Sequence, residues 1–364
     1  MKKVGLYTIY ICNYGAVLQT YALKNCIEEL YDDVNVSIVD FYSREYYRIF
    51  LTSTKNPIKK WLKYGMILIH YPAIFTRNKR EKKFIAEELN LSERYPDLNL
   101  LLKKMPTYDY YLTGSDQVFN SNSKYSLLYF QQFRIKSGIR AAYAPSFGQS
   151  VFSDEEKLKI KELTRSFDFL SCREDDGAQM LSHLLGKDVP CVVDPTLLLP
   201  ADKWTKMMKI PKTSERYLLV YDLNGGVPML NIARKVAAEK RLKIYCITRH
   251  PDIGFIYKSI DKVIYDAGPR EFVGYFSKAS YVITDSFHGT AFSLIFRRNF
   301  NTYIAVAKSS QRIKSLLTVC GLSHRVIMDG TRIDTSDKCF QQFNEPLFNA
   351  YRQSSIDYIT NIFK

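Results

Sequence analysis

The sequence predicts an α/β protein built from two domains. With 364 residues, the chain is longer than a single compact core usually supports, so two domains are expected. Short apolar, β-branched runs alternate with segments of helical spacing, and this alternation begins again after about residue 200. Small polar turns follow several predicted strands, as they do in open sheets that bind ligands at the strand ends. We therefore expect two α/β domains facing a cleft, with the strand order left open.

The first half opens with a strand, a helix and a second strand. Residues 4–8 and 34–39 are apolar runs that suit buried strands, and residues 16–30 repeat apolar side chains at helical spacing. A glycine at the strand-to-helix turn is typical of nucleotide-binding folds, although the GxGxxG fingerprint is absent. Asn13 and Gly15 are thus candidates to line a ligand crevice. The simpler interpretation is that they only shape the turn.

Two polar groups follow later strands of this half. The remaining predicted elements are helices at 84–91, 98–104, 154–167 and 178–185, and strands at 108–113, 139–144, 169–172 and 189–193. Gly114, Ser115 and Asp116 follow one strand at the edge where open sheets bind ligands. Arg173 follows another, and its planar fork can grip a carboxylate or a phosphate at two points. A structural ion pair with Glu174 or a neighbour is the alternative for Arg173.

The pattern restarts after a polar connection at residues 200–213. The second half is predicted to contain strands at 217–221, 242–248, 263–265, 281–284 and 301–307, and helices at 228–240, 269–280, 290–296 and 310–320. Arg312 lies in the first turns of the last of these helices, where a basic side chain opposes the helix dipole. A bound anion would explain it, and a solvated helix face is the simpler alternative.

These elements predict the domain organisation. We expect an N-terminal domain at residues 1–200 and a C-terminal domain at 201–334. The helical tail at 335–364, broken near Pro346, is expected to pack back across both domains.

The turn after the predicted strand 281–284 is the leading candidate for a functional site. Asp285 and Ser286 suit a helix start, because their side-chain oxygens can accept bonds from the first amides. A helix start beyond a strand's carboxyl end attracts anions. The same turn carries His288, with Gly289 expected to leave room for a ligand and Thr290 opening the apolar helix. A lone histidine is more often structural, but its position in this turn favours a functional role.

Basic residues gather in one stretch of the chain. The net charge is +15, and eleven Lys and Arg residues lie between Arg44 and Lys83 against two glutamates, interleaved with aromatic and aliphatic side chains. We interpret residues 42–105 as a basic, aromatic helical insertion in the first domain. Contact with an anionic membrane leaflet and a solvated face packed on the parent domain are equally supported. Nucleic acid is not expected as a partner, because no known binding motif accompanies the patch.

The sequence argues against several classes of protein. The seven cysteines are scattered without a CxxC pair or a Cys/His cluster, which excludes a disulfide framework and a structural zinc site. No signal peptide is visible, and no apolar run reaches the length of about 20 residues that a membrane span needs. We therefore expect a cytoplasmic protein with neither a bound metal nor a cofactor.

Several short motifs together resemble those of the polysaccharide pyruvyl transferase family. In order, they are Asn13-Tyr14-Gly15-Ala16 with Gln19, Thr113-Gly114-Ser115-Asp116-Gln117, Arg173-Glu174, Val193-Asp194-Pro195, Thr284-Asp285-Ser286-Phe287-His288-Gly289-Thr290 and the segment 310–317. The resemblance extends from the first strand to about residue 322, and the run from Asp285 to Thr290 is its most specific part. The insertion and the tail beyond residue 330 carry little of it.

The resemblance implies a fold, a donor and a reaction. The implied fold is GT-B-like, with two Rossmann-like domains, and the implied donor substrate is phosphoenolpyruvate. The implied reaction forms a pyruvate ketal on two hydroxyls of a sugar in cell-surface polysaccharide (exopolysaccharide) biosynthesis. A lipid-linked acceptor would explain the basic segment, as it would hold the enzyme at the inner membrane face. His288 is then expected to be the acid/base and Arg173 the clamp on the donor's anionic groups.

Two alternatives remain open, and the second comes from another class of protein. One is a GT-B glycosyltransferase with a nucleotide-sugar donor, which binding of a nucleotide sugar in preference to phosphoenolpyruvate would favour. The other is a saccharide-binding relative that has lost catalysis, against which the presence of both His288 and Arg173 argues.

Overall fold

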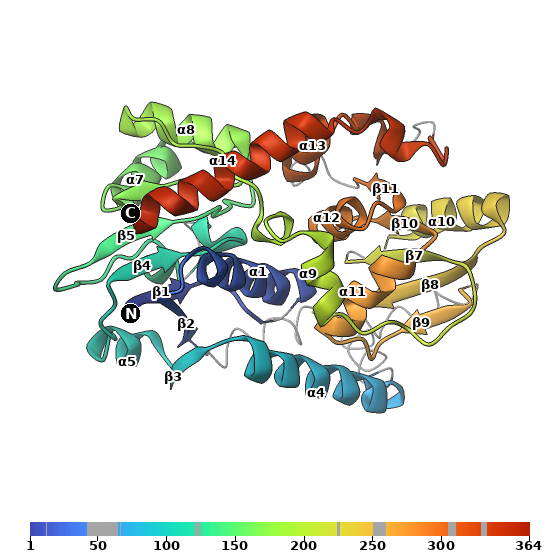
Figure 1. Cartoon of the computed structure of the whole chain (residues 1–364), viewed down its shortest axis with the longest axis horizontal. Helices are drawn as coiled ribbons and strands as arrows, with labels where there is room; N and C mark the ends of the chain where they lie inside the picture. The colour runs from blue at the N-terminus through green and yellow to red at the C-terminus, as the bar shows by residue number, and fades with distance from the viewer. Residues whose placement is uncertain are drawn as a thin grey trace. The chain divides into compact units, whose positions relative to one another are not determined.

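The chain forms two compact units, each built from more than one stretch of sequence (Figure 1). The computed structural model describes residues 1–11, 13–41, 65, 67–120, 123, 125–223, 226–249, 260–304, 311–328 and 333–364. Unit 1 comprises Met1–Leu51, Ala86–Leu199 and Pro346–Lys364, and unit 2 comprises Thr52–Ile85 and Pro200–Glu345. The division beside residue 200 lies where we expected it. Of the predicted insertion at 42–105, residues 42–64 and 66 lie outside the described residues. The described residues 67–85 group with unit 2 rather than with the first domain, and most of the tail groups with unit 1. That the tail also packs across unit 2 stays a prediction.

Unit 1 contains a parallel sheet of six strands in the order β3-β2-β1-β4-β5-β6. The strands are β1 (Lys2–Tyr7), β2 (Val34–Phe41), β3 (Leu91–Tyr95), β4 (Tyr110–Thr113), β5 (Ile139–Ala142) and β6 (Phe169–Leu170). Its helices are α1 (Tyr14–Leu30), α5 (Leu98–Lys103), α6 (Ser126–Tyr129), α7 (Asp154–Thr164), α8 (Asp175–Leu185) and α14 (Glu345–Phe363), with 3-10 turns η1 (Gln117–Phe119) and η2 (Pro195–Leu197). The central strand β4 is buried throughout, as expected for a parallel sheet covered on both faces.

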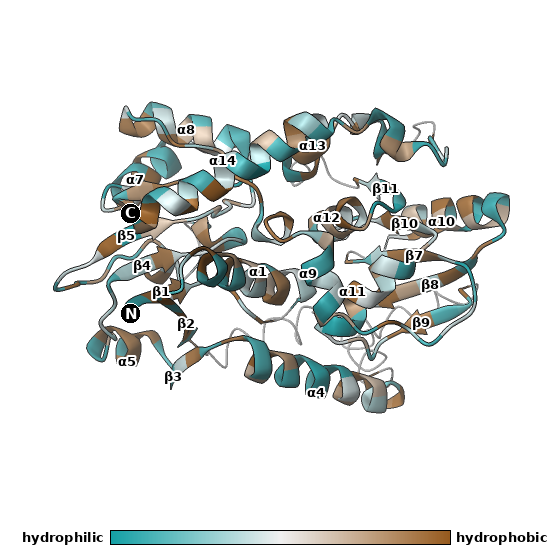
Figure 2. Cartoon of the chain, in the orientation of Figure 1, coloured by the Kyte–Doolittle hydropathy of each residue, from teal (hydrophilic) through white to brown (hydrophobic). Residues whose placement is uncertain are grey.

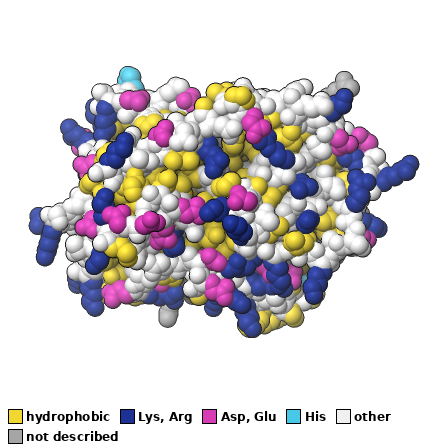
Figure 3. Space-filling view, viewed as in Figure 1, with side chains coloured by type: hydrophobic (Ala, Val, Ile, Leu, Met, Phe, Trp, Pro, Cys, Tyr) yellow, Lys and Arg dark blue, Asp and Glu magenta, His cyan; other side chains and the backbone are white. Residues whose placement is uncertain are grey.

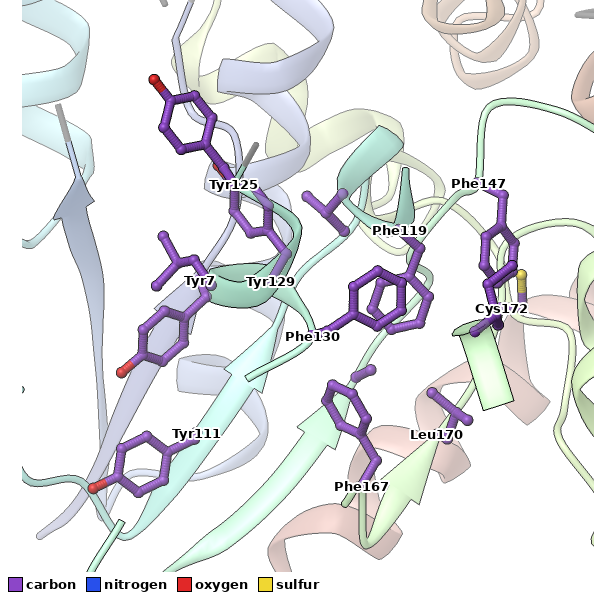
Figure 4. Packing of buried hydrophobic residues seen from close by; sticks show 14 of the residues in the cluster. Tyr7, Tyr111, Phe119, Tyr125, Tyr129, Phe130, Phe147, Phe167, Leu170 and Cys172 are labelled. Atoms are coloured by element: carbon purple, nitrogen blue, oxygen red, sulfur yellow. The ribbon is translucent and has the colours of Figure 1, made fainter. Parts of the chain in front are cut away.

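An aromatic cluster forms part of the core of unit 1 (Figure 4). The rings of Phe119 and Phe130 stack with centroids 4.3 Å apart, and Phe147 and Phe167 meet Phe119 at tilted angles. These rings come from η1 and from the loops that follow α6, β5 and α7. Their packing therefore holds these loops in place against the sheet.

Helix α14 completes unit 1. Its Phe363 ring packs on Tyr110 of β4 at 4.8 Å, and the Tyr358 hydroxyl donates to the carbonyl of Ala142 in β5 at 3.0 Å. The last helical segment therefore covers the sheet that the first residues of the chain begin.

Unit 2 contains a second parallel sheet of six strands, in the order β12-β11-β10-β7-β8-β9. The strands are β7 (Tyr217–Asp222), β8 (Lys243–Thr248), β9 (Lys262–Ile264), β10 (Tyr281–Thr284), β11 (Asn299–Tyr303) and β12 (Val326–Ile327). Its helices are α4 (Tyr71–Glu88, whose last residues lie in unit 1), α9 (Ala201–Met207), α10 (Val227–Lys240), α11 (Pro269–Lys278), α12 (Phe287–Ile295) and α13 (Gln311–Val319), with 3-10 turns η5 (Ser323–Arg325) and η6 (Cys339–Gln342). Figure 2 shows β7 and β8 largely brown, in keeping with their burial.

Both sheets share one topology, which the sequence had left open. Counted within each unit, the strand order is 3-2-1-4-5-6, the order of doubly wound nucleotide-binding sheets. In such a sheet the chain leaves the first strand in one direction and the fourth in the other, so a crevice opens at their carboxyl ends. This switch point lies between β1 and β4 in unit 1 and between β7 and β10 in unit 2.

Some predicted elements were wrong. The run 189–193 forms only a single bridge, between Cys172 and Cys191, and is not a strand. The predicted helix at 84–91 is the end of the longer α4, and β3 was missed because its exposed residues hide the strand pattern. The tail is a helix only from Glu345, with Pro346 in its first turn, where a proline fits.

Among the described residues, no helix combines the length and the apolar character needed to cross a membrane.

Candidate functional site

The turn between β10 and α12 lies at the switch point of unit 2. Ser286 is the N-cap of α12, and its hydroxyl accepts a bond from the amide of Gly289 at 3.3 Å. The Ser286 amide itself donates to the Thr284 hydroxyl at 3.1 Å. Two of the amides expected to hold an anion are thus bonded within the turn, while those of Phe287 and His288 begin the helix at the positive end of its dipole.

His288 is buried in the first turn of α12. Its ring meets Phe287 edge-on with centroids 5.4 Å apart. An imidazole enclosed in this way has little freedom to rotate, which suits a group that exchanges a proton with one bound molecule.

Gly289 has a packing role that the sequence did not reveal. A Cβ atom there would overlap the Thr284 hydroxyl and lie 2.9 Å from the Thr284 Cβ. The space beside Gly289 is therefore filled by Thr284 rather than held open for a ligand. The glycine lets α12 approach β10 closely, as the last glycine of dinucleotide-binding turns does.

Side-chain bonds tie this turn to the strands on both sides. The Asp285 carboxylate accepts from the Leu223 amide at 3.0 Å, directly after β7, and the Thr284 hydroxyl donates to the Tyr221 carbonyl at 2.9 Å. On the other side, the Thr290 hydroxyl bonds that of Thr302 in β11 at 2.8 Å. Asp285 and Thr290 thus fix the position of the His288 turn at the sheet edge.

Arg312 lies near the same edge of unit 2. It is the second residue of α13, which follows β11, and β11 pairs with β10 in parallel. The starts of α12 and α13 therefore both lie beyond the carboxyl ends of neighbouring strands. The Arg312 side chain is half-buried.

At the switch point of unit 1, the turn after β4 is held rigidly. The Gly114 amide donates to the Tyr7 carbonyl at 2.9 Å, and a Cβ at Gly114 would lie 2.9 Å from the Thr8 Cβ. The Thr8 hydroxyl donates to the Ser115 carbonyl at 3.0 Å. Asp116 has a φ of 73°, which is unusual for a residue other than glycine and is found most often at functional sites.

Arg173 lies beside this turn, surrounded by carboxylates. Its side chain is 1% exposed, and Nη1 donates to Asp194 Oδ2 at 2.7 Å and to the Ser115 hydroxyl at 3.4 Å. Glu174 Oε1 lies 3.6 Å from Nε, and Asp116 Oδ1 lies 3.9 Å from Nη2. Burial opposes the charge, but Asp194, Glu174 and Asp116 together raise the pKa of Arg173. The guanidinium is therefore charged near neutral pH.

Asn13 and Gly15 belong to the start of α1. Asn13 is its N-cap, accepting from the Ala16 amide at 2.6 Å, and Gly15 is buried in its first turn. The structure thus shows Asn13 capping the helix, and a role of Asn13 and Gly15 in lining a ligand crevice stays a prediction.

The sequence did not reveal the hydrogen bonds by which Asp194 and Gln19 connect separate segments of unit 1. Asp194 Oδ1 also accepts from the Thr196 amide at 3.0 Å, so this one carboxylate caps η2 and pairs with Arg173. The Gln19 amide donates to the Thr8 hydroxyl at 2.9 Å. Both residues belong to the family motifs, which was the only signal that could have found them.

No group of three or more His, Cys, Asp or Glu side chains suited to hold a metal occurs within the part of the chain that the structure describes. Metal-independent chemistry stays a prediction.

Solved structures show the fold. The UDP-GlcNAc 2-epimerase of Methanocaldococcus jannaschii, in complex with UDP-GlcNAc and UDP, has a TM-score of 0.50 at 14% identity, covering 99% of this chain and 98% of that one. The S. aureus MnaA–UDP co-structure gives 0.49 at 13% identity, covering 98% of this chain and 92% of that one. No curated protein matches the sequence. The predicted fold class, α/β with two Rossmann-like, GT-B-like domains, is confirmed.

The family is shown by sequence. A sequence model described as polysaccharide pyruvyl transferase matches residues 13–303, which include the cap of α1, the turn after β4, Arg173 and the His288 turn. This match covers most of the chain and confirms the resemblance in its motifs. The chain therefore belongs to the polysaccharide pyruvyl transferase family.

Proposed function

We propose that this protein transfers the pyruvate moiety of phosphoenolpyruvate to two hydroxyls of a sugar, forming a ketal and releasing phosphate. The observation that carries the proposal is the buried His288 in the first turn of α12, at the switch point of unit 2 in a chain of this family. The acceptor is a saccharide of a cell-surface polysaccharide, and no separate cofactor takes part.

The reaction needs proton transfer in both directions. A proton is added to the vinyl methylene of the donor, which becomes a methyl group and leaves C2 electrophilic. One sugar hydroxyl attacks C2 and loses its proton. The C2–O bond to phosphate then breaks, and the second hydroxyl attacks C2 and closes the ring as its proton passes to the released phosphate. A histidine can give and take these protons near neutral pH, so we assign His288 as the acid/base.

The donor also needs a site for its two anionic groups. We assign this to the first turn of α12, at Phe287, His288 and the Ser286 hydroxyl, together with Arg312 at the start of α13. The position of both helix starts beyond neighbouring strands of one sheet supports this assignment.

The carboxylates around Arg173 favour a role in positioning its neighbours over the expected direct contact with the donor's anionic groups. Three carboxylates already balance its charge, so a further anion would meet net negative charge there. We propose that Arg173 holds Ser115 and Asp116 in place at the edge of unit 1, and that these residues, with Gly114, contact the sugar.

Calorimetric titration with phosphoenolpyruvate tests the donor site. We expect the wild type to bind, and Arg312→Gln to weaken binding by about 1.5–3 kcal/mol, the usual cost of losing a charge-assisted hydrogen bond. Arg165→Gln, which changes an exposed arginine at the C-terminal cap of α7, is the matched control and should bind normally. Binding of a UDP-sugar without any binding of phosphoenolpyruvate, with or without saccharide present, would overturn the proposal.

A further inference from the structure

Helix α4 attaches to unit 2 through charged side chains. Arg80 pairs with Asp266 at 2.9 Å and with Glu271 at 3.2 Å. The next residue, Glu81, pairs with Arg249 at 3.1 Å. A surface helix of a soluble protein normally turns its apolar side chains inward and its charges outward. In α4 the ion pairs face the protein together with the buried ring of Phe84.

The outward face of this segment is apolar at its start. Leu68 and Ile69, in the helical residues just before α4, are 73% and 69% exposed, and Tyr71 and Phe75 are 56% and 57% exposed. Single exposed apolar side chains are ordinary, but four within eight residues form a patch. Figure 2 shows α4 mostly teal, with brown near its first residues.

Lysines continue the same face. Lys79 and Lys82 follow Phe75 at spacings of four and seven residues, which places them on one side of the helix, and Lys83 lies beside them. All three are exposed. Figure 3 shows dark-blue side chains beside a yellow group along the lower edge of the view, where Figure 1 draws α4. We call the surface formed by Leu68, Ile69, Tyr71, Phe75, Lys79, Lys82 and Lys83 the α4 stripe.

We infer that the α4 stripe rests on a bilayer surface that contains anionic lipid. The helix then lies in the plane of the interface, where its apolar side chains enter the boundary between headgroups and acyl chains. The Tyr71 hydroxyl stays at the level of the headgroups, and the three lysines meet the lipid phosphates. The ion pairs on the inner face hold unit 2 against the helix, so that α4 carries the unit to the surface.

The charge pattern favours lipid over other occupants. A second copy packed antiparallel would set the lysines of each helix against the apolar half of the other, and a parallel copy would set lysine against lysine. A nucleic acid would leave Leu68 and Ile69 with nothing to stack on. An anionic bilayer alone offers an apolar layer beneath a negative surface, and the net charge of +15 adds long-range attraction. This inference does not depend on the proposed function.

Vesicle cosedimentation of the full-length protein tests the inference. We expect binding to vesicles of phosphatidylcholine mixed with phosphatidylglycerol, weakening as salt screens the lysines, and little binding to phosphatidylcholine alone. Replacing Lys79, Lys82 and Lys83 together by glutamine should weaken binding by about five-fold for each lysine. Phe75→Glu should weaken it at least as much as one such lysine.

Leu158→Glu is the matched control for Phe75→Glu, because Leu158 is 64% exposed on α7 of unit 1. It should bind vesicles as the wild type does, and all variants should melt at the wild-type temperature. Wild-type protein that stays in solution with anionic vesicles at low salt would overturn the inference. So would wild-type binding by Phe75→Glu, or a solution dimer that Phe75→Glu dissociates, which would assign the α4 stripe to a second copy.

Discussion

At Arg173 one guanidinium faces the carboxylates of Asp116, Glu174 and Asp194, and of these three the Asp194 carboxylate lies nearest, at 2.7 Å. Because both partners of this pair are almost completely buried, neither can exchange it for water. The same Asp194 also caps η2. One carboxylate therefore connects the end of β6, the turn after β4 and the 3-10 turn that follows.

Replacing Asp194 by asparagine should destabilise unit 1. The side chain keeps its shape but loses the charge that Arg173 faces, so we expect a loss of about 2–3 kcal/mol in the free energy of unfolding. Thermal and urea unfolding followed by circular dichroism measure it. Asp188→Asn, at an exposed aspartate of the same unit, should change stability by less than about 0.5 kcal/mol. Equal stability of the two variants would contradict a positioning role for the pair.

The sequence could identify Arg173 as important but not its role. A guanidinium after a strand suits an anion clamp and a structural pair equally well. The position of Asp194 decides between an anion clamp and a structural pair. Asp194 follows a segment that is not a strand, and the tertiary fold brings it to Arg173. His288 differs, because its helix, cap and strand are adjacent in sequence and could be predicted locally.

The contact between α12 and β10 determines the position of His288. The helix begins at Phe287, three residues earlier than predicted, so His288 lies inside its first turn rather than before it. Gly289 makes this close approach possible, because Thr284 fills the space that a side chain would need.

Gly289→Ala should push α12 away from β10. Overpacking of this kind costs about 1–3 kcal/mol, and displacement of His288 should lower activity more than stability alone explains. Thermal unfolding and turnover of the folded fraction measure the two effects. Gly65→Ala is the control, since a Cβ at that helical glycine meets no other atom within 4 Å. A Gly289→Ala variant as stable and active as Gly65→Ala would show that the contact is unimportant.

Two predictions of strands failed because the local sequence pattern does not match the pairing in the structure. Only one of the five residues of β3 is fully buried, so its sequence lacks a strand pattern. Residues 189–193 have the pattern of a buried strand, yet pair through a single bridge. Pairing with other strands in the folded chain, and not local propensity, decides both cases.

The two sheets of the chain have the same topology. Alternating strands and helices could be read from the sequence, and so could the restart near residue 200. The strand order could not, because it depends on which strands pair and not on their composition. Likewise, nothing local to residues 346–364 indicates that they join unit 1, since the contacts of Phe363 and Tyr358 span most of the chain.

The shared topology gives each unit a ligand-binding edge, and the proposed reaction requires both a donor and an acceptor. We assign the donor to the edge that carries His288 and Arg312 and the sugar to the edge that carries Ser115 and Asp116.

The most direct test is phosphate release from phosphoenolpyruvate with a panel of free and lipid-linked saccharides, with the ketal identified by mass spectrometry and NMR. We predict acceptor-dependent release and a pyruvate ketal from the wild type and from His183→Asn, an exposed histidine on α8. His288→Asn, folded and able to bind the donor, should be slower by about 10²–10⁴-fold. Undiminished ketal formation by His288→Asn, or sugar transfer from a nucleotide sugar without any use of phosphoenolpyruvate, would contradict the account.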